Sequence, residues 1–310
     1  MRHLDADTVW LGLGMRGAID ALERAIGEDG FPPVPQRLHL REDDQQLLVM
    51  PSFTGGWAGV KLITIDPANP GRGLPLIHGS YTLFGPPALA PVATIDGAAL
   101  TELRTAAVSG LATRHLARPD ASRLVILGAG AQGRSHLVAM AAVRPLSEVV
   151  VVAPRPASVD AFLAFAADHL DGVAVRAGTP DDVADADLVC ACTSSATPVF
   201  DGRRLPPGVH VNAIGAYLPS MTEVDAVTVA SSRVVVETRE AAFAEKGDLL
   251  QAEEAGAWSR DQLAADLTAL VRDRVPVRTR DDERTLFASV GVAYEDLVVA
   301  RAVAEAAGAS

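Results

Sequence analysis

The stretch Leu124-Val125-Ile126-Leu127-Gly128-Ala129-Gly130-Ala131-Gln132-Gly133 decides the fold of this chain. Four apolar residues run directly into the pattern Gly-x-Gly-x-x-Gly, and a helical pattern of apolar residues follows. In such a strand–turn–helix unit the first glycine makes the turn, the second lets the backbone approach a pyrophosphate, and the third packs helix on strand. The free N–H groups of the helix's first turn then face the phosphates. The stretch therefore predicts a Rossmann-type dinucleotide site rather than a purely structural turn, with cofactor-binding residues Gly128, Gly130, Ala131 and Gln132.

Length and composition bound the class of protein. A chain of 310 residues suggests one large or two moderate domains. Its 39 acidic residues outnumber its 27 Lys and Arg residues, for a net charge of −12, so the composition does not indicate a basic nucleic-acid-binding surface. No apolar run reaches membrane-spanning length, and the N-terminus lacks the apolar core of a signal peptide. Cys190 and Cys192 follow an apolar run, which favours a core strand in a reduced, cytoplasmic enzyme. The seven histidines show no metal-binding spacing, so no metal is expected.

The N-terminal third has two kinds of pattern. Residues 5–29 predict a helix, because Asp5 can cap its start and apolar residues recur on one face before a proline-rich turn ends it. The pattern then changes to short strands separated by Gly, Pro, Asn and Asp, which favours adjacent antiparallel strands. These predicted strands cover residues 47–50, 60–65, 76–84 and 89–95.

From Arg123 onward, strand and helix patterns alternate, after a long helix predicted for residues 98–117. This alternation is typical of a parallel, doubly wound sheet. Predicted strands cover 123–127, 148–153, 173–175, 187–192, 209–213 and 233–236, and predicted helices cover 131–143, 157–169 and 180–185. Further helical patterns lie near 259–271 and from about 285 to 307.

The expected fold is therefore α/β, with a Rossmann-type doubly wound parallel sheet and a separate α+β domain. We expect the α+β domain over residues 1–114 and the Rossmann domain over 115–285. The final helix, within 286–310, is expected to return to the first domain.

The end of the second Rossmann strand indicates which nucleotide is preferred. NAD enzymes usually carry Asp or Glu there for the ribose 2′-hydroxyl, whereas this strand ends in Ala153-Pro154-Arg155. Arg155 lies where a 2′-phosphate would sit, so NADP is favoured over NAD. The alternative is that Arg155 is a solvated loop residue and the enzyme accepts both cofactors.

Two further sets of residues are candidates for the chemistry. Thr193, Asn212, Gly215 and Tyr217 follow predicted parallel strands, at the carboxyl ends where such folds place the nicotinamide. Three cations stand among apolar residues instead of in charged segments. They are Arg37, Lys61 and Arg104. Taken alone, each of these cations is more often a surface or structural charge.

In their order along the chain, several segments resemble the ornithine cyclodeaminase/μ-crystallin family. They are Lys61 with Gly79-Ser80, Leu100-Thr101-Glu102-Leu103-Arg104-Thr105-Ala106-Ala107, the glycine turn, Asn212-Ala213-Ile214-Gly215-Ala216 and Ser289-Val290-Gly291-Val292-Ala293-Tyr294-Glu295-Asp296. The resemblance covers nearly the whole chain. Thr105 and Gly291 within these segments join the predicted cofactor-binding residues.

The resemblance implies a homodimer whose α+β domain binds the substrate and forms the dimer contact. It also implies hydride transfer between a nicotinamide and an α-amino or α-imino acid. The three cations that hold the substrate carboxylate in the family map onto Arg37, Lys61 and Arg104, and Ser80 stands where family members carry a threonine. A guanidinium can bind a carboxylate with two parallel bonds, whereas lysine acts as a point charge.

One departure bears on the reaction. Where the cyclodeaminase has a catalytic aspartate, this chain has Tyr217, with Glu223 as the nearest alternative carboxylate. Ornithine cyclodeamination is therefore disfavoured. The sequence predicts a reductase of an α-imino acid or cyclic ketimine that uses NADPH, with Lys61, Arg104 and Tyr217 as catalytic residues. The alternatives are an ornithine or lysine cyclodeaminase, an alanine- or opine-type dehydrogenase, and a non-catalytic NADPH-binding protein.

Overall fold

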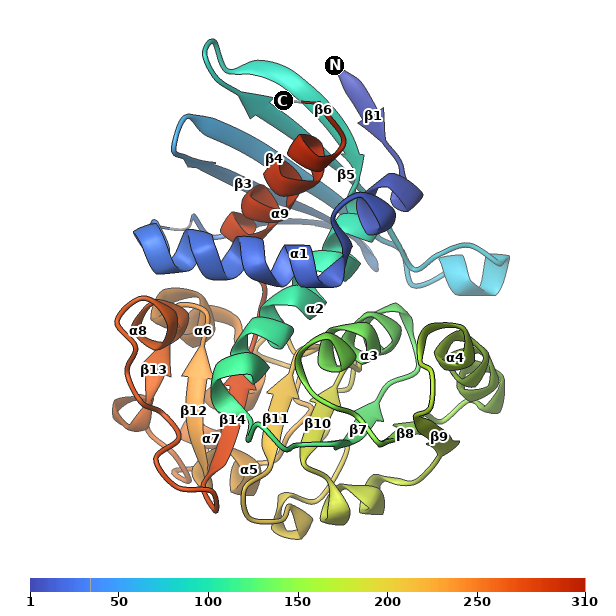
Figure 1. Cartoon of the computed structure of the whole chain (residues 1–310), viewed down its shortest axis with the longest axis vertical. Helices are drawn as coiled ribbons and strands as arrows, with labels where there is room; N and C mark the ends of the chain where they lie inside the picture. The colour runs from blue at the N-terminus through green and yellow to red at the C-terminus, as the bar shows by residue number, and fades with distance from the viewer. Residues whose placement is uncertain (34, 310) are drawn as a thin grey trace. The chain divides into compact units, whose positions relative to one another are not determined.

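The computed structural model describes residues 1–33 and 35–309 and confirms the α/β class. The chain forms two compact units, each built around its own sheet (Figure 1). Unit 1 comprises Met1–Ala25, Phe31–Ala107 and Val292–Ser310, and unit 2 comprises Ile26–Gly30 and Val108–Gly291. Among the described residues, no helix is long and apolar enough to cross a membrane.

Unit 1 contains a six-stranded sheet in the order β1-β6-β5-β4-β3-β2. β1 pairs in parallel with β6, and all other neighbours are antiparallel. The strands are β1 (Arg2–Leu4), β2 (Leu38–Glu42), β3 (Gln45–Thr54), β4 (Trp57–Ile65), β5 (Ile77–Gly85) and β6 (Ala90–Asp96). Its helical segments are most of α1 (Ala6–Asp29), η1 (Asn69–Arg72), the first half of α2 (Gly97–Leu116) and α9 (Ala293–Ala306).

The register of this sheet decides which side chains share a face. Met50, Lys61 and Tyr81 lie directly opposite one another on β3, β4 and β5. Their side chains point to one face because successive residues of a strand alternate. α9 packs against β3, β4 and β5, and Figure 1 shows it lying across these strands. The next row, containing Leu62 and Ser80, points to the other face.

Unit 2 contains an eight-stranded, fully parallel sheet in the order β13-β12-β14-β11-β10-β7-β8-β9. The strands are β7 (Arg123–Leu127), β8 (Glu148–Val152), β9 (Ala174–Ala177), β10 (Leu188–Ala191), β11 (His210–Ala213), β12 (Ser232–Val236), β13 (Ala265–Asp266) and β14 (Arg284–Ala288). The chain moves outward from β7 to β9 and then returns to β10 on the other side of β7. This reversal of strand order is the point at which doubly wound sheets bind ligands.

Helices accompany the parallel strands of unit 2. They include α3 (Ala131–Val143), α4 (Pro156–His169), α5 (Ala226–Ala230), α6 (Arg239–Glu245), α7 (Gly247–Glu254) and α8 (Leu267–Val271), with shorter turns η2 (Pro180–Asp185), η3 (Gly202–Arg204) and η4 (Arg260–Gln262). The central strands are buried almost throughout, and β7 and β10 are largely apolar. This is the pattern expected of a parallel sheet that is covered on both faces.

Most predicted elements are confirmed, including the helix over residues 131–143, the strand over 123–127 and the antiparallel strands of unit 1. The predicted helix over 285–307 is wrong at its start, because Arg284–Ala288 form β14 between β11 and β12. The predicted helix over 259–271 is mostly wrong, since η4 and β13 precede the short α8. β1 and β2 were not predicted.

Candidate functional site

The glycine turn after β7 has the geometry that its sequence predicts. Gly128 has φ +111°, and a Cβ added there would lie 2.4 Å from the carbonyl oxygen of Cys192. A Cβ on Gly133 would lie 1.9 Å from the carbonyl oxygen of Gly128. Gly130 differs, because a Cβ there would meet no protein atom within 4 Å. The first and third glycines are therefore required by the turn itself, whereas the second leaves open space.

The open space at Gly130 lies at the start of a helix. Gly130 is the N-cap of α3, and Ala131 and Gln132 are its first residues. The N–H groups of a helix's first turn are left without partners inside the helix and attract phosphate groups. This donor set and the open approach at Gly130 suit the pyrophosphate of a dinucleotide.

Arg155 lies just beyond β8, as the N-cap of α4. Its side chain is exposed, and the residues that the structure describes offer it no hydrogen-bond or ion-pair partner. No acidic residue lies between the end of β8 and Arg155. This strand end is thus equipped with a cation instead of the carboxylate that would bind a ribose 2′-hydroxyl.

The loops after β10 and β11 carry the other predicted cofactor residues of this sheet edge. Thr193, Gly215 and Tyr217 are half-buried in these loops. Asn212 lies within β11, in agreement with the strand predicted over 209–213; it is fully buried, and its Nδ2 donates to Thr113 Oγ1 at 3.0 Å. The Asn212 side chain is therefore committed inside unit 2. Gly291 follows β14 with φ +74°, and its N–H donates to Glu237 at 2.8 Å.

In unit 1, two of the predicted cations belong to one buried charged cluster. Lys61 Nζ donates to Asp296 Oδ1 at 2.8 Å. Arg104 forms ion pairs with Glu295 at 2.8 Å and with Asp296 at 3.0 Å. All four side chains are at least nine-tenths buried. Asp296 thus bridges Lys61 to Arg104, and α9 supplies both carboxylates.

Lys61 retains donors for a further ligand. An ammonium group has three donors, and within residues 1–33 and 35–309 only Asp296 accepts one from Lys61. Burial lowers the pKa of Lys61 to about 7, with a smaller contribution from Arg104, while Asp296 opposes this. Arg37 also lowers the pKa of Lys61, so its charge acts on the same cluster. The cluster can therefore bind an anion.

Ser80 and Thr105 are placed differently from each other. Ser80 is exposed and pairs with Leu62, so it points to the face opposite Lys61. The substrate-binding role of Ser80 stays a prediction, and within this unit its side chain lies on the sheet face opposite Lys61. Thr105 is buried next to Arg104 in α2.

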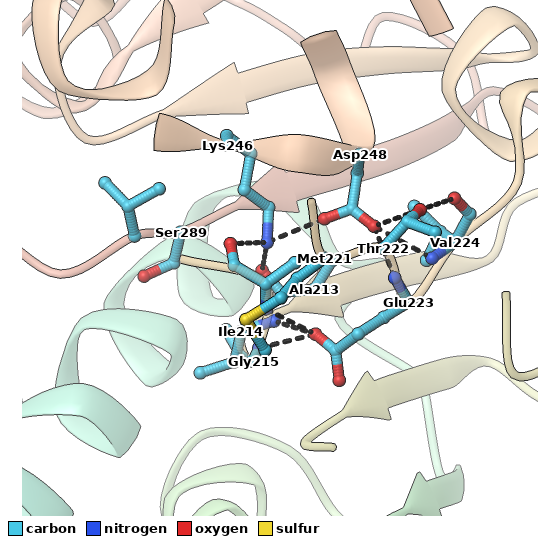
Figure 2. A network of polar contacts seen from close by, with 12 residues as sticks. Ala213, Ile214, Gly215, Met221, Thr222, Glu223, Val224, Lys246, Asp248 and Ser289 are labelled. Atoms are coloured by element: carbon cyan, nitrogen blue, oxygen red, sulfur yellow. Dashed lines mark hydrogen bonds and ion pairs between the residues drawn. The ribbon is translucent and has the colours of Figure 1, made fainter. Parts of the chain in front are cut away.

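Sequence reasoning missed the carboxylates that hold these groups. Glu295 and Asp296 belong to the family-like segment Ser289–Asp296, and their signal is two acidic residues at the start of an apolar, Ala- and Val-rich helix. Glu223 is the alternative catalytic carboxylate, but one of its oxygens accepts from the loop after β10 and the other from the loop after β11. Figure 2 shows the contact with Ile214 and Gly215 in the second loop. Across the described chain, no three His, Cys, Asp or Glu side chains are grouped to hold a metal.

Known proteins resemble the chain along almost its whole length. A Delta(1)-pyrroline-2-carboxylate reductase of Bacillus cereus (strain ATCC 10987) is 34% identical over 291 residues, 93% of this chain and 89% of the relative. The structure of a Thermococcus litoralis Delta(1)-pyrroline-2-carboxylate reductase in complex with NADH and L-proline matches with a TM-score of 0.93 and 30% identity, covering 99% of this chain and 97% of that one. An archaeal alanine dehydrogenase dimer with bound NAD matches with a TM-score of 0.91 and 28% identity, covering 99% and 96%.

The chain also matches the sequence signature of one protein family. The signature matches residues 15–310, which include both the charged cluster of unit 1 and the glycine turn of unit 2. The chain therefore belongs to the ornithine cyclodeaminase/mu-crystallin family.

Proposed function

We propose that this protein is an NAD(P)H-dependent reductase of α-imino acids, with a cyclic ketimine such as Δ1-pyrroline-2-carboxylate as the substrate class. The observation that carries the proposal is the buried pair Lys61 and Arg104, two cations at an anion site in a chain that also holds a dinucleotide turn. Relatives named Delta(1)-pyrroline-2-carboxylate reductase support the same substrate class.

The cations of unit 1 hold the substrate carboxylate in this proposal. Arg104 offers a planar fork, which Glu295 and Asp296 orient from α9, and Lys61 adds a point charge with two further donors. Arg37 contributes a third positive charge. This arrangement fixes the carbon next to the carboxylate, which is the carbon that must accept a hydride.

The cofactor and the proton complete the reaction. When bound, the reduced nicotinamide supplies the hydride that turns the imine carbon into an amine carbon. The imine nitrogen needs one proton, which Lys61 or Tyr217 can donate when the substrate arrives unprotonated. Lys61 suits this role because burial lowers its pKa to about 7, close to the working pH.

Tyr217 favours reduction over cyclodeamination. Cyclodeamination must position a distal ammonium group and expel ammonia, and a carboxylate suits that task by charge and as a base. Tyr217 has no carboxylate and offers an aromatic wall with one hydroxyl. Glu223 does not replace the missing aspartate, since its oxygens already accept backbone N–H groups.

We propose NADPH as the preferred cofactor, with NADH as a weaker alternative. The exposed Arg155 guanidinium, which has no partner among residues 1–33 and 35–309, supports this choice, because it can form charge-assisted bonds to a 2′-phosphate. The related structures contain NADH or NAD, so the preference is a property proposed for this chain alone.

We also propose a homodimer that forms through the outer face of the unit 1 sheet. Leu38 and Leu62 share one cross-strand row on this face, and Leu40 and Phe53 extend it. These four side chains are 59%, 42%, 56% and 67% exposed. Such an apolar surface marks a protein contact, and a related alanine dehydrogenase is a dimer. Light scattering of the protein and of Phe53→Asp tests this: the protein is expected at twice its chain mass and the variant at one.

An absorbance assay of NADPH oxidation tests the function itself. We expect rapid oxidation with Δ1-pyrroline-2-carboxylate or Δ1-piperideine-2-carboxylate, and little proline or ammonia from ornithine with NAD or NADP. Robust proline formation from ornithine would establish the cyclodeaminase alternative, and turnover of pyruvate with ammonia or an amino acid would establish the dehydrogenase alternative. Tight NADPH binding without any turnover would establish the non-catalytic alternative.

A further inference from the structure

Glu223 joins two loops at the carboxyl end of the unit 2 sheet. Its Oε1 accepts from the N–H and the hydroxyl of Thr193, at 2.5 and 2.8 Å, in the loop after β10. Its Oε2 accepts from the N–H groups of Ile214, Gly215 and Ala216 in the loop after β11. The Glu223 side chain is fully buried. Figure 2 shows this carboxylate facing the backbone of Ile214 and Gly215.

A second layer fixes Glu223 and the same loop. Asp248 Oδ1 accepts from the N–H groups of Glu223 and Val224 at 2.6 and 2.9 Å. Lys246 Nζ lies 2.8 Å from Asp248 Oδ2 and donates to the carbonyls of Ala213 and Ala216 at 3.0 and 3.2 Å (Figure 2). The segment from Ala213 to Ala216 is therefore held through its N–H groups by Glu223 and through its carbonyls by Lys246.

These loops border the dinucleotide turn. The carbonyl oxygen of Cys192, next to Thr193, would lie only 2.4 Å from a Cβ on Gly128, so the loop after β10 packs directly on the turn. β7 and β10 are the neighbours between which the strand order reverses. A dinucleotide binds across this point in doubly wound sheets. The loop after β11 leads to Tyr217.

We propose that Glu223 is a positioning residue, which fixes the loops around the nicotinamide and holds Tyr217 in register with them. This proposal rests on the function proposed above. A carboxylate has two oxygens that only accept, so it can serve both loops. A glutamine would satisfy one loop and turn an NH2 group toward the N–H donors of the other.

Glu237 repeats this arrangement at the next strand of the same sheet. Its carboxylate accepts from the hydroxyl of Ser289 and from the N–H groups of Val290 and Gly291, the latter at 2.8 Å. The loop after β14 is thus also tied by a buried, acceptor-only side chain. Glu223 and Glu237 each hold a loop that follows a strand of this sheet. This recurrence supports the view that buried glutamates shape the carboxyl edge of the sheet.

Kinetics of Glu223→Gln, with Glu240→Gln as the matched control, test the proposal. Glu240 is an exposed glutamate of α6 in the same unit. We expect Glu223→Gln to lower kcat about 100-fold, because small displacements from the reactive geometry cost that much. Its primary isotope effect with NADPH deuterated at the transferred position is expected to rise, since hydride transfer becomes rate-limiting. Glu223→Asp keeps both acceptor oxygens and is expected to recover part of kcat.

Two results would overturn the proposal. One is a Glu223→Gln enzyme with unchanged kcat, KM and isotope effect. The other is a loss of activity that follows only the folded fraction, measured by circular dichroism, with KM and isotope effect unchanged. If the unaltered protein reduces no imine, the proposed function fails, and NADPH binding by fluorescence then decides the role of Glu223. Glu223→Gln is expected to weaken that binding about tenfold, and unchanged binding would refute the positioning role.

Discussion

Replacement of Arg104 tests the carboxylate site most directly, and the structure determines how the replacement should be made. Arg104 contacts Glu295 and Asp296 at 2.8 and 3.0 Å while 5% exposed. Removal of one partner of a buried ion pair costs about 3–5 kcal/mol, because the remaining charge is uncompensated. Arg104→Met should therefore unfold at lower denaturant concentration as well as lose activity. Activity loss in that variant alone would not identify a substrate ligand.

Two further variants separate stability from substrate binding. Arg104→Lys keeps the charge but loses the fork, so one charge-assisted hydrogen bond worth about 1.5–3 kcal/mol is lost. Because about 1.4 kcal/mol is a factor of ten, kcat/KM for the imine should fall roughly 10- to 150-fold. In the double variant Arg104→Met with Glu295→Gln, the carboxylate left without its Arg104 partner is also removed. The double variant should therefore regain stability but not activity. If the double variant regained activity together with stability, as measured by NADPH oxidation and urea unfolding, Arg104 would be structural only.

Other predictions concern the cofactor, the pH profile and the reaction class. Arg155→Ala should weaken NADPH binding and leave NADH binding nearly unchanged; equal affinity of the unaltered protein for both cofactors would contradict this. Gly130→Ala should keep its urea midpoint and lose NADPH affinity in fluorescence titrations, whereas Gly133→Ala should lose stability as well, because its Cβ would lie 1.9 Å from a carbonyl oxygen. The pKa of Lys61 is lowered to about 7, so affinity for an inert carboxylate inhibitor should fall as pH rises through 7, and Lys61→Arg should flatten this dependence. The unfolded lysine, with a pKa near 10.5, binds more protons between pH 7 and 10.5, so Lys61 should make the free energy of unfolding rise with pH in that window. Tyr217→Asp should weaken imine reduction and raise proline formation from ornithine; unchanged values of both rates would remove Tyr217 from the site.

The local patterns of the sequence were sufficient for most of the Rossmann unit. The turn after Leu127 and the helix over 131–143 follow from neighbouring residues, and both are confirmed. The sequence predicts a helix where β14 lies, because the apolar residues Leu286, Phe287 and Ala288 lead directly into the longer apolar pattern of the last helix. Periodicity alone does not separate a short buried strand from a helix. What makes Arg284–Ala288 a strand is its pairing with β11 and β12, which lie far away in the sequence.

In the candidate site, too, local sequence patterns pointed to single residues but not to their partners far away in the sequence. Lys61 and Arg104 were identified because cations are unusual among apolar residues, but the partner Asp296 is 235 positions from Lys61. The sequence alone could not assign Ser80 to a face of the sheet, because the face depends on strand register. The pairing of Lys61 with Tyr81 turns Ser80 outward, and a shift of one residue would reverse it.

Burial of a lysine beside an aspartate does not by itself identify a binding site, and this chain contains the comparison. Lys246 is as buried as Lys61 and has Asp248 as its partner at 2.8 Å. Its Nζ donates to the carbonyls of Ala213 and Ala216 and forms an ion pair with Asp248. Lys61 has a single acceptor in the part of the chain that the structure describes, although a buried ammonium is stable only when its donors are satisfied. The remaining donors of Lys61 can bind an external acceptor, and in the proposed function a substrate carboxylate is that acceptor. We therefore infer a binding role for Lys61 from its remaining donors, and not from its burial or charge, which Lys246 shares.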